Sequence, residues 1–254
     1  MLAHMLRAAQ RGPNLAAWTT QTSGTTLQLY CVTWTGTQFV AAGLSGTILT
    51  SATGGAWTSR TSGTTNSLIG IGGSSSLLVV VGASGTIRTS ADGITWTSRA
   101  SGVGDVLRSV AWSGSTYVTM GNNGRPLTSS DGTSWTLQTT MSGASGYAIT
   151  GIVWAGTQFV AVGFKGATNS LIYTSATGTS WTSRSSGTTV DLNGVAWNGS
   201  ILVAVGNSGT ILTSSDGVTW TSRTSGTTAA LSGVFASSAR VVAVGASGTI
   251  ITTT

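Results

Sequence analysis

Short runs of apolar and β-branched residues recur along most of this chain, each bounded by Gly, Ser, Asp or Asn. In residues 206–223 two such runs flank the turn residues Asp216 and Gly217, and the second run opens on Trp220. An Asp-Gly turn between two β-rich runs is typical of a β-hairpin. Six tryptophans share this place in the pattern, with spacings of 39, 39, 39, 46 and 39 residues: Trp18, Trp57, Trp96, Trp135, Trp181 and Trp220. A period of about 40 residues with four short strands per repeat predicts a β-propeller.

Each repeat contains four candidate strands, which predict a four-stranded antiparallel blade. The first and innermost strand is expected at residues 30–34, 68–72, 107–112, 149–154, 192–197 and 231–235. The second strand is apolar on both faces, as in strands buried between neighbouring blades, and is expected at 38–42, 77–81, 116–120, 158–162, 201–205 and 240–244. The third corresponds to 47–50, and the fourth starts at the repeated Trp. Gly43 and its counterparts end the second strand, where we expect a turn with positive φ.

The repeats begin in the middle of a unit. Residues 17–26 match 219–228, the last strand of a unit, whereas 245–254 supply a third strand that no fourth strand follows. The sequence therefore predicts one all-β domain over 14–254, a six-bladed propeller whose ring is closed because the N- and C-terminal strands share one blade. Such closure removes free sheet edges.

Residues 1–13 differ in kind from the repeats. Leu2, Met5 and Leu6 fall at helical spacing before Gly12 and Pro13, which predicts a short helical tail. A helix this short is marginal alone in water, so we expect it to lie on the propeller or to dock on another molecule. A frayed start is the alternative.

The turn sequence resembles the Asp-box repeat. Ser90-Ala91-Asp92-Gly93-Ile94-Thr95-Trp96, with its copies at 129–135 and 214–220, is similar to the Ser-x-Asp-x-Gly-x-Thr-Trp hairpin of sialidase-type and photosystem II assembly-factor-like propellers. This turn is one residue shorter than the family pattern, and Thr53 and Thr177 replace the Asp in two copies. The resemblance implies a propeller over nearly the whole chain. In that fold we expect Asp92, Asp131 and Asp216 to cap turn amides and the repeated tryptophans to pack between blades.

Charge is scarce and evenly distributed. Charged residues make up 6% of the chain, there is no Glu, and the formal net charge is +6. One repeated position supplies several arginines, which are expected around the rim: Arg60, Arg99, Arg184 and Arg223. Nucleic-acid binders cluster such residues on one face, so no nucleic-acid partner is expected. No apolar run approaches a membrane span, and no cleavable signal peptide is evident.

The sequence contains no recognisable catalytic set. Sialidase-type chemistry needs an acid and a Tyr nucleophile paired with Glu, and Glu is absent. Asp105 and Asp191 precede inner strands, where two carboxylates can serve as acid and base, but we expect them to be solvated loop residues. With His4 as the only histidine and Cys31 as the only cysteine, neither a triad nor a zinc cluster can form. We therefore expect no enzyme, no cofactor and no metal.

Departures from the repeat mark candidate binding residues. Two insertions, around 141–148 and 164–170, produce the 46-residue spacing and are expected to extend one corner of the propeller. They carry candidate ligand or partner contacts: Tyr147, Phe164, Lys165 and Asn169. Neutral loop drift is the alternative. Arg88 stands where sister repeats have Leu49, Leu127 and Leu212, and we expect it to extend to solvent.

A nearly uncharged surface, a separate tail and the lack of a catalytic set favour a non-catalytic structural or binding propeller. The first hypothesis is a virion-surface or tail-associated accessory or attachment protein of a bacteriophage, docked on another protein through residues 1–12. This hypothesis favours a virion or extracellular location. A glycan-binding lectin is the first alternative. An assembly-factor-like, protein-binding propeller, implied by the resemblance, is the second.

Overall fold

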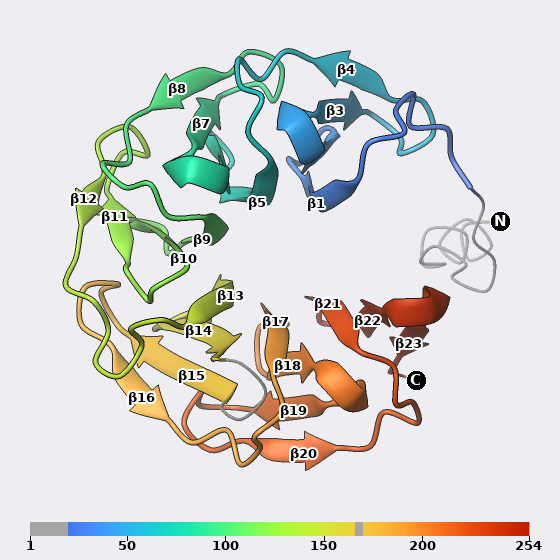
Figure 1. Cartoon of the computed structure of the whole chain (residues 1–254). Helices are drawn as coiled ribbons and strands as arrows, with labels where there is room; N and C mark the ends of the chain where they lie inside the picture. Colours follow the sequence, from blue (N-terminus) through green and yellow to red (C-terminus); the bar gives the residue numbers. More distant parts are fainter. Residues whose placement is uncertain (1–19, 166–169, 254) are drawn as a thin grey trace, which may run out of the picture.

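Six antiparallel sheets stand around a common axis in the computed structural model, which describes residues 20–165 and 170–253 (Figure 1). Five sheets have four strands each, and the sixth has three among the described residues. The prediction of a six-bladed propeller with four-stranded antiparallel blades is thereby confirmed. The expected tail with Leu2, Met5 and Leu6 lies outside the described residues, as do Trp18 and Asn169.

Each blade is formed by strands consecutive in the chain, with the first strand innermost (Figure 1). Blade 1 contains β1 (Leu29–Trp34), β2 (Phe39–Gly43), β3 (Ile48–Ser51) and β4 (Thr58–Arg60). Blade 2 contains β5 (Leu68–Gly73), β6 (Leu78–Gly82), β7 (Ile87–Ser90) and β8 (Thr97–Arg99). Blade 3 contains β9 (Leu107–Trp112), β10 (Tyr117–Gly121), β11 (Leu127–Ser129) and β12 (Thr136–Leu137).

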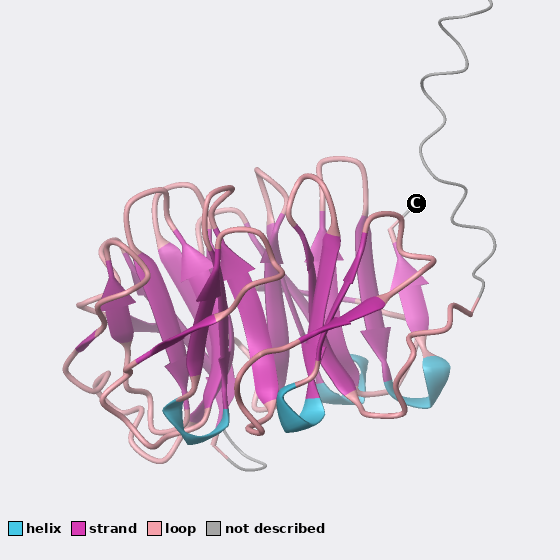
Figure 2. Cartoon of the chain, turned by 90° about the horizontal axis from the view of Figure 1, so that it is seen from above, coloured by secondary structure: helices cyan, strands magenta, loops and turns pink. Residues whose placement is uncertain are grey.

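The second half of the ring repeats this order. Blade 4 contains β13 (Ala148–Trp154), β14 (Phe159–Phe164), β15 (Ser170–Ser175) and β16 (Thr182–Arg184). Blade 5 contains β17 (Leu192–Trp197), β18 (Leu202–Gly206), β19 (Ile211–Ser214) and β20 (Thr221–Arg223). Blade 6 contains β21 (Leu231–Ala236), β22 (Val241–Gly245) and β23 (Ile250–Thr252). Four short 3₁₀ turns gather at one end of the ring (Figure 2): η2 (Leu44–Gly46), η3 (Ala83–Gly85), η4 (Asn207–Gly209) and η5 (Ala246–Gly248).

The second strands of blades 1–5 form the centre of the core, because nearly all of their residues are buried between neighbouring strands and blades. In β6, for example, Val79, Val80 and Val81 are fully buried. These strands start about one residue later than the sequence predicts. The residue expected to open β2, Gln38, instead closes the preceding turn by accepting the backbone N–H of Thr35 at 2.9 Å.

The glycine at the end of each second strand is required for a reason other than the one expected. Gly82 has φ −170°, which is extended backbone, so the prediction of a positive φ is wrong at this position. A Cβ added to Gly82 would overlap the carbonyl oxygen of Ser67, so close backbone approach excludes a side chain. The left-handed conformation lies two and three residues later, at Ser84 (φ 53°) and Gly85 (φ 66°).

The repeated tryptophan of the later blade packs into the apolar cluster at each of four blade junctions: Trp96, Trp135, Trp181 and Trp220. At three of them an inner-strand tryptophan joins it: Trp112, Trp154 and Trp197. The junction of blades 5 and 6 has a corresponding cluster, built on Val203, Val205, Leu231 and Ala243, with no tryptophan among the described residues. A cavity of about 550 Å³ lies there instead, lined by β18, β19, β22 and β23.

Blades 6 and 1 expose apolar side chains toward the space between them. Inner strands pack against each other at the five other junctions, whereas β21 and β1 make no comparable contact within the described part of the chain. Val32 of β1 is 61% exposed and Phe235 of β21 is 67% exposed. Residues 20–28, which belong partly to the predicted closing strand, form no strand. Because the rest of that segment lies outside the described residues, ring closure stays a prediction.

Candidate functional site

The aspartates of the repeated turn hold the hairpin together. Asp92 Oδ1 accepts the backbone N–H groups of Ile94 and Thr95, each at 2.8 Å, and the Ser90 hydroxyl donates to the same oxygen at 2.9 Å. The N–H donors of Thr95 and Ile94 lower the pKa of Asp92 to about 2. Asp131 and Asp216 make the same pair of backbone contacts, at 2.7–2.9 Å. These carboxylates therefore cap turn amides.

The tryptophan that follows each of these turns is held by its own hairpin. Trp96 Nε1 donates to the Gly93 carbonyl at 3.1 Å, and Trp57, Trp135, Trp181 and Trp220 make the corresponding bond at 2.9–3.1 Å. With the indole N–H satisfied and the rings partly buried, these five side chains are rigid parts of the scaffold.

The two remaining aspartates are paired within their own blades. Asp105 accepts from Arg125 at 3.3 Å and from Asn123 at 3.0 Å. Asp191 Oδ2 accepts from Asn207 at 3.3 Å, and its Oδ1 is buried without a hydrogen-bond partner among the described residues. Both aspartates lie in loops, as expected, but they are partly buried rather than fully solvated. Asp105 precedes β9 of blade 3, and Asp191 precedes β17 of blade 5. Blade 4, with its inner strand β13, lies between them, so the two aspartates are not in adjacent blades (Figure 1). In the described part of the chain, no group of three His, Cys, Asp or Glu side chains is placed to hold a metal ion.

The two insertions meet at one corner of blade 4. Lys165 Nζ lies 4.8 Å from the centre of the Tyr147 ring, a cation–π contact. Phe164 ends β14, where it pairs with Ala148 of β13 and with Ser170 of β15. Of the candidate binding residues, the structure thus brings Tyr147, Phe164 and Lys165 together, and Asn169 lies outside the described residues.

Part of the first insertion is committed to packing. Met141 is 3% exposed and Ala144 is fully buried, and both belong to the apolar cluster of blades 3 and 4. Tyr173 of β15 donates its phenol proton to the Ser142 carbonyl at 2.8 Å. The insertion is therefore anchored to the core of its blade, and the corner offers a surface supported by ordered structure.

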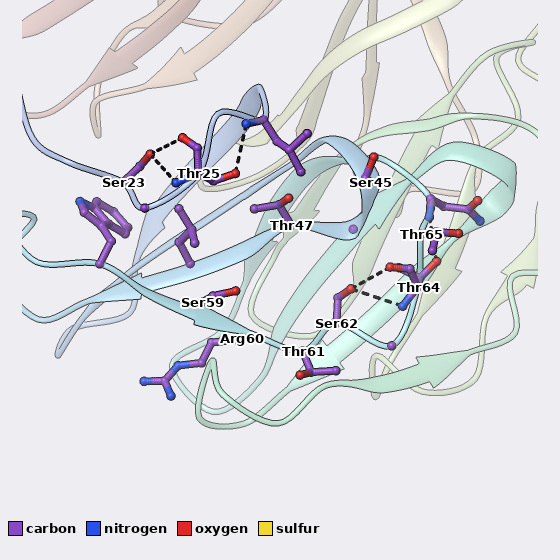
Figure 3. Close-up of a pocket in the computed structure, with 17 residues that line it drawn as sticks. Ser23, Thr25, Ser45, Thr47, Ser59, Arg60, Thr61, Ser62, Thr64 and Thr65 are labelled. Atoms are coloured by element: carbon purple, nitrogen blue, oxygen red, sulfur yellow. Dashed lines mark hydrogen bonds between the residues drawn. The ribbon is translucent and has the colours of Figure 1, made fainter.

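Two grooves of almost equal size open beside the outermost strands of blades 1 and 5. The first, of about 910 Å³, is lined by Ser23 and Thr25 of the connection into blade 1, by Leu49, by Trp57 and by Arg60 (Figure 3). The second, of about 900 Å³, is lined by the same positions of the repeat: Ser186, Thr188, Leu212, Trp220 and Arg223.

The lining of these grooves is fixed by hydrogen bonds. Arg60 Nε donates to Thr50 Oγ1 at 2.9 Å, and Arg223 Nε donates to Thr213 Oγ1 at 2.8 Å. In the connection, Ser23 Oγ donates to the Thr25 carbonyl at 2.9 Å (Figure 3). Each groove thus presents an indole, a guanidinium and several hydroxyls in set positions. This combination suits a ligand with an aromatic or polar group and hydrogen-bonding atoms.

Sequence reasoning missed the grooves, although their components recur in the sequence as Ser-Gly-Thr and Trp-Thr-Ser-Arg. The arginines were expected around the rim, and the Ser-Gly-Thr segments were not combined with them. Each groove combines the Ser-Gly-Thr connection before a blade with the Trp-Thr-Ser-Arg strand of that blade. These two segments are far apart in the sequence and meet only in the fold.

Arg88 occupies the corresponding place in blade 2. Its Nη2 donates to the Gly63 carbonyl at 2.7 Å, whereas the side chain was expected to extend to solvent. Its Nε is buried and has no hydrogen-bond partner among the described residues. The guanidinium is therefore directed onto the connection between blades 1 and 2.

No protein-family model and no curated protein matches the sequence. Solved structures match in fold. A structure of virginiamycin B lyase from Staphylococcus aureus aligns with a TM-score of 0.82 and 14% identity over 95% of this chain and 86% of that one. YCF48 from Cyanidioschyzon merolae aligns with a TM-score of 0.72 and 14% identity, over 92% and 84%. A structure of YCF48 bound to D1 peptide aligns with a TM-score of 0.71 and 16% identity, over 90% and 78%.

At these identities the likeness establishes the β-propeller fold alone. One of the similar structures is named as a lyase and another is described with a bound peptide, so this fold accommodates both catalysis and binding. The Asp-box resemblance has no matching family model and stays a prediction. Within the described residues, no helix is long and apolar enough to cross a membrane.

Proposed function

We propose that this chain is a non-catalytic, protein-binding propeller that holds a segment of a partner protein in its grooves. The observation that carries the proposal is the pair of equivalent grooves in blades 1 and 5, each with a fixed indole, a fixed guanidinium and hydroxyls. Trp and Arg in set positions are the residues that contribute most to protein recognition. The likeness to YCF48, solved with D1 peptide, supports the same class of function.

The absence of catalysis is part of this proposal. Three of the five aspartates are held by turn amides. The other two lie in separate blades, where Asp105 pairs with Arg125 and Asp191 accepts from Asn207 through one oxygen, its other oxygen being buried. A general acid or base has to reach a reacting proton, which these contacts oppose.

The finer expectations about partners remain proposals as well. Docking on another protein through residues 1–12, at a bacteriophage surface, is supported by the weakly charged composition and the distinct N-terminal pattern. A comparison of the solution mass of the full chain with that of a chain lacking residues 1–13 tests it. If the full chain forms oligomers and the shortened chain is a monomer, residues 1–12 act as a docking segment. If both chains are monomers, docking of this segment on a second copy of the chain is refuted. A glycan ligand is the alternative for the grooves, because Trp and hydroxyls also suit sugars.

Ring closure is proposed on the evidence of the cavity between blades 5 and 6. Its lining residues Val203, Ile211 and Ala243 occupy the repeat positions of Val40, Ile48 and Val80, the residues that surround Trp96 between blades 1 and 2. By the repeat period, Trp18 is the counterpart of Trp96 for blade 6. We infer that Trp18 fills this cavity and that its segment supplies the missing fourth strand.

Peptide selection on the immobilised full chain tests the binding function. A random peptide library and a glycan array are applied in parallel, and the affinity of enriched peptides is measured by calorimetry. Arg60→Ala with Arg223→Ala should weaken peptide binding by about ten- to 150-fold, since a charged hydrogen bond contributes roughly 1.5–3 kcal/mol.

Arg184→Ala is the matched control. Arg184 makes the same bond to Thr174, at 3.0 Å, but Tyr173 lies across the corresponding place in its blade. Its replacement should leave peptide affinity unchanged. Enrichment of glycans without any peptide would overturn the proposal in favour of a lectin.

A further inference from the structure

One position of the third strand distinguishes the two blades with an open groove, blades 1 and 5, from blades 2 and 4. The residues at this position are Leu49, Arg88, Leu127, Tyr173 and Leu212 in blades 1–5. In blades 1, 2, 4 and 5 each pairs with the middle residue of the fourth strand, which is a serine. Leu127 of blade 3 pairs instead with Leu137 of the two-residue β12, and Gln138 stands there in place of the arginine of the other blades. In blades 1 and 5 the residue is Leu, it is 2% exposed, and it forms part of the groove lining. In blades 2 and 4 a longer side chain stands there.

The longer side chains reach across the groove to the connection from the preceding blade. Arg88 donates to the Gly63 carbonyl at 2.7 Å, and Tyr173 donates to the Ser142 carbonyl at 2.8 Å. Both acceptors belong to a Ser-Gly pair of the connection, Ser62-Gly63 in one case and Ser142-Gly143 in the other. The molecule therefore fills two of its own grooves with a planar group that carries a hydrogen-bond donor.

In the connections into blades 1, 2, 4 and 5, the glycines of the Ser-Gly pairs show the same division. A Cβ added to Gly63 would lie 3.7 Å from Arg88 Nη1, and one added to Gly143 would lie 3.6 Å from the Tyr173 hydroxyl. A Cβ added to Gly24 or Gly187 would meet no atom within 4 Å. The connections into blades 1 and 5 thus face open space where those into blades 2 and 4 face an occupant.

We propose that the open grooves of blades 1 and 5 each bind a tyrosine side chain of a partner protein. The ring lies over Leu49 or Leu212 beside the tryptophan, and the phenol donates to the backbone carbonyl of Ser23 or Ser186, as Tyr173 donates to Ser142. This inference rests on the proposed protein-binding function and assigns its ligand chemistry.

Two observations favour tyrosine over arginine as the occupant. Arg88 leaves its Nε buried without a hydrogen-bond partner in the described part of the chain, whereas the single polar atom of Tyr173 is bonded. A buried polar group without a partner costs free energy. The grooves also contain Arg60 and Arg223 in a chain of net charge +6, so a second cation would be repelled and a neutral ring attracted.

Leu49, Leu212 and Tyr173 have the same kinds of cross-strand neighbours, so a tyrosine fits at the floor of each open groove. A Leu→Tyr substitution at this position should therefore block the groove. Leu49 pairs with Ala41 and Ser59, Leu212 with Ala204 and Ser222, and Tyr173 with Ala161 and Ser183. Leu49→Tyr with Leu212→Tyr should therefore fold normally and fill both grooves from within.

The test is an NMR titration of the full chain with the peptide acetyl-Gly-Ser-Tyr-Ser-Gly-amide, observed at the tryptophan indole N–H signals. Trp57 and Trp220 line the two grooves, so their signals should shift and those of Trp96 and Trp181 should not. The same peptide with Phe in place of Tyr should bind about two- to tenfold more weakly, the effect of one hydrogen bond.

Two variants give opposite expectations. Leu49→Tyr with Leu212→Tyr should abolish the shifts while the melting temperature stays unchanged. Arg88→Leu should open a third groove, because blade 2 has the same Trp, Ser and Arg at its outer strand, and the Trp96 signal should then shift as well.

Unaltered binding by the blocked double variant, or no added response in Arg88→Leu, would overturn the inference. Peptides selected from a library that still bind the blocked variant would refute the tyrosine assignment while leaving protein binding intact. If the unmodified chain binds no peptide from the library at all, the proposed protein-binding function itself is refuted.

Discussion

The cavity between blades 5 and 6 leads to the prediction that Trp18 stabilises the propeller as much as Trp220 does at the junction of blades 4 and 5. The perturbation is Trp18→Ala, and the matched variant is Trp220→Ala. Trp220 packs at the junction of blades 4 and 5 in the place that the repeat assigns to Trp18 one junction later. If the proposed closure holds, the two variants remove equivalent contacts.

The magnitude follows from the buried area. A fully buried aromatic side chain removes about 150–250 Å² from water, which at about 25 cal/mol per Å² is worth roughly 4–6 kcal/mol. Since Trp220 is only partly buried, we expect about 3 kcal/mol from each substitution, the lower end of measured Trp→Ala losses. In a domain of this size that corresponds to a fall of about 6–12 °C in melting temperature.

Thermal unfolding followed by circular dichroism and calorimetry measures the effect. Val218→Ala is the control, because Val218 lies in the same hairpin as Trp220 and is 42% exposed, so its loss should change stability little. An unchanged melting temperature in Trp18→Ala beside a clear fall in Trp220→Ala would refute closure of the ring by the N-terminal segment.

Three further predictions concern other parts of the scaffold. Gly82→Ala should lower stability by about 1–3 kcal/mol in denaturant unfolding because its Cβ would overlap the Ser67 carbonyl, whereas Gly104→Ala, which meets no atom within 4 Å, should not. The pKa of Asp92 is lowered from 3.8 to about 2, so the ionised carboxylate contributes fully to folding stability above pH 4, and this contribution is lost as the pH falls toward 2. The difference in melting temperature between the wild type and Asp92→Asn should therefore vanish between pH 4 and pH 2. Burial raises the pKa of Cys31 from 9.0 to about 12, so alkylation by iodoacetamide at pH 8 should be about a thousandfold slower in the native than in the unfolded chain.

The repeat and its strands could be predicted from the sequence because they depend on local pattern. Alternating apolar runs, an Asp-Gly turn and a following Trp specify a hairpin within about twenty residues, and the period of these units specifies the ring. The meeting of Tyr147 with Lys165 also follows from strand order alone, since both flank the first two strands of one blade.

The grooves and the contacts of Arg88 were decided only by the tertiary structure. Gly63 lies 25 residues before Arg88, and Ser142 lies 31 residues before Tyr173, so no local pattern pairs either side chain with its acceptor. The same holds for Gly82, whose lack of a side chain is required by the backbone of Ser67 rather than by its own dihedral angles. Each of these features depends on atoms that a neighbouring strand or blade supplies, and their positions exist only once the blades have packed.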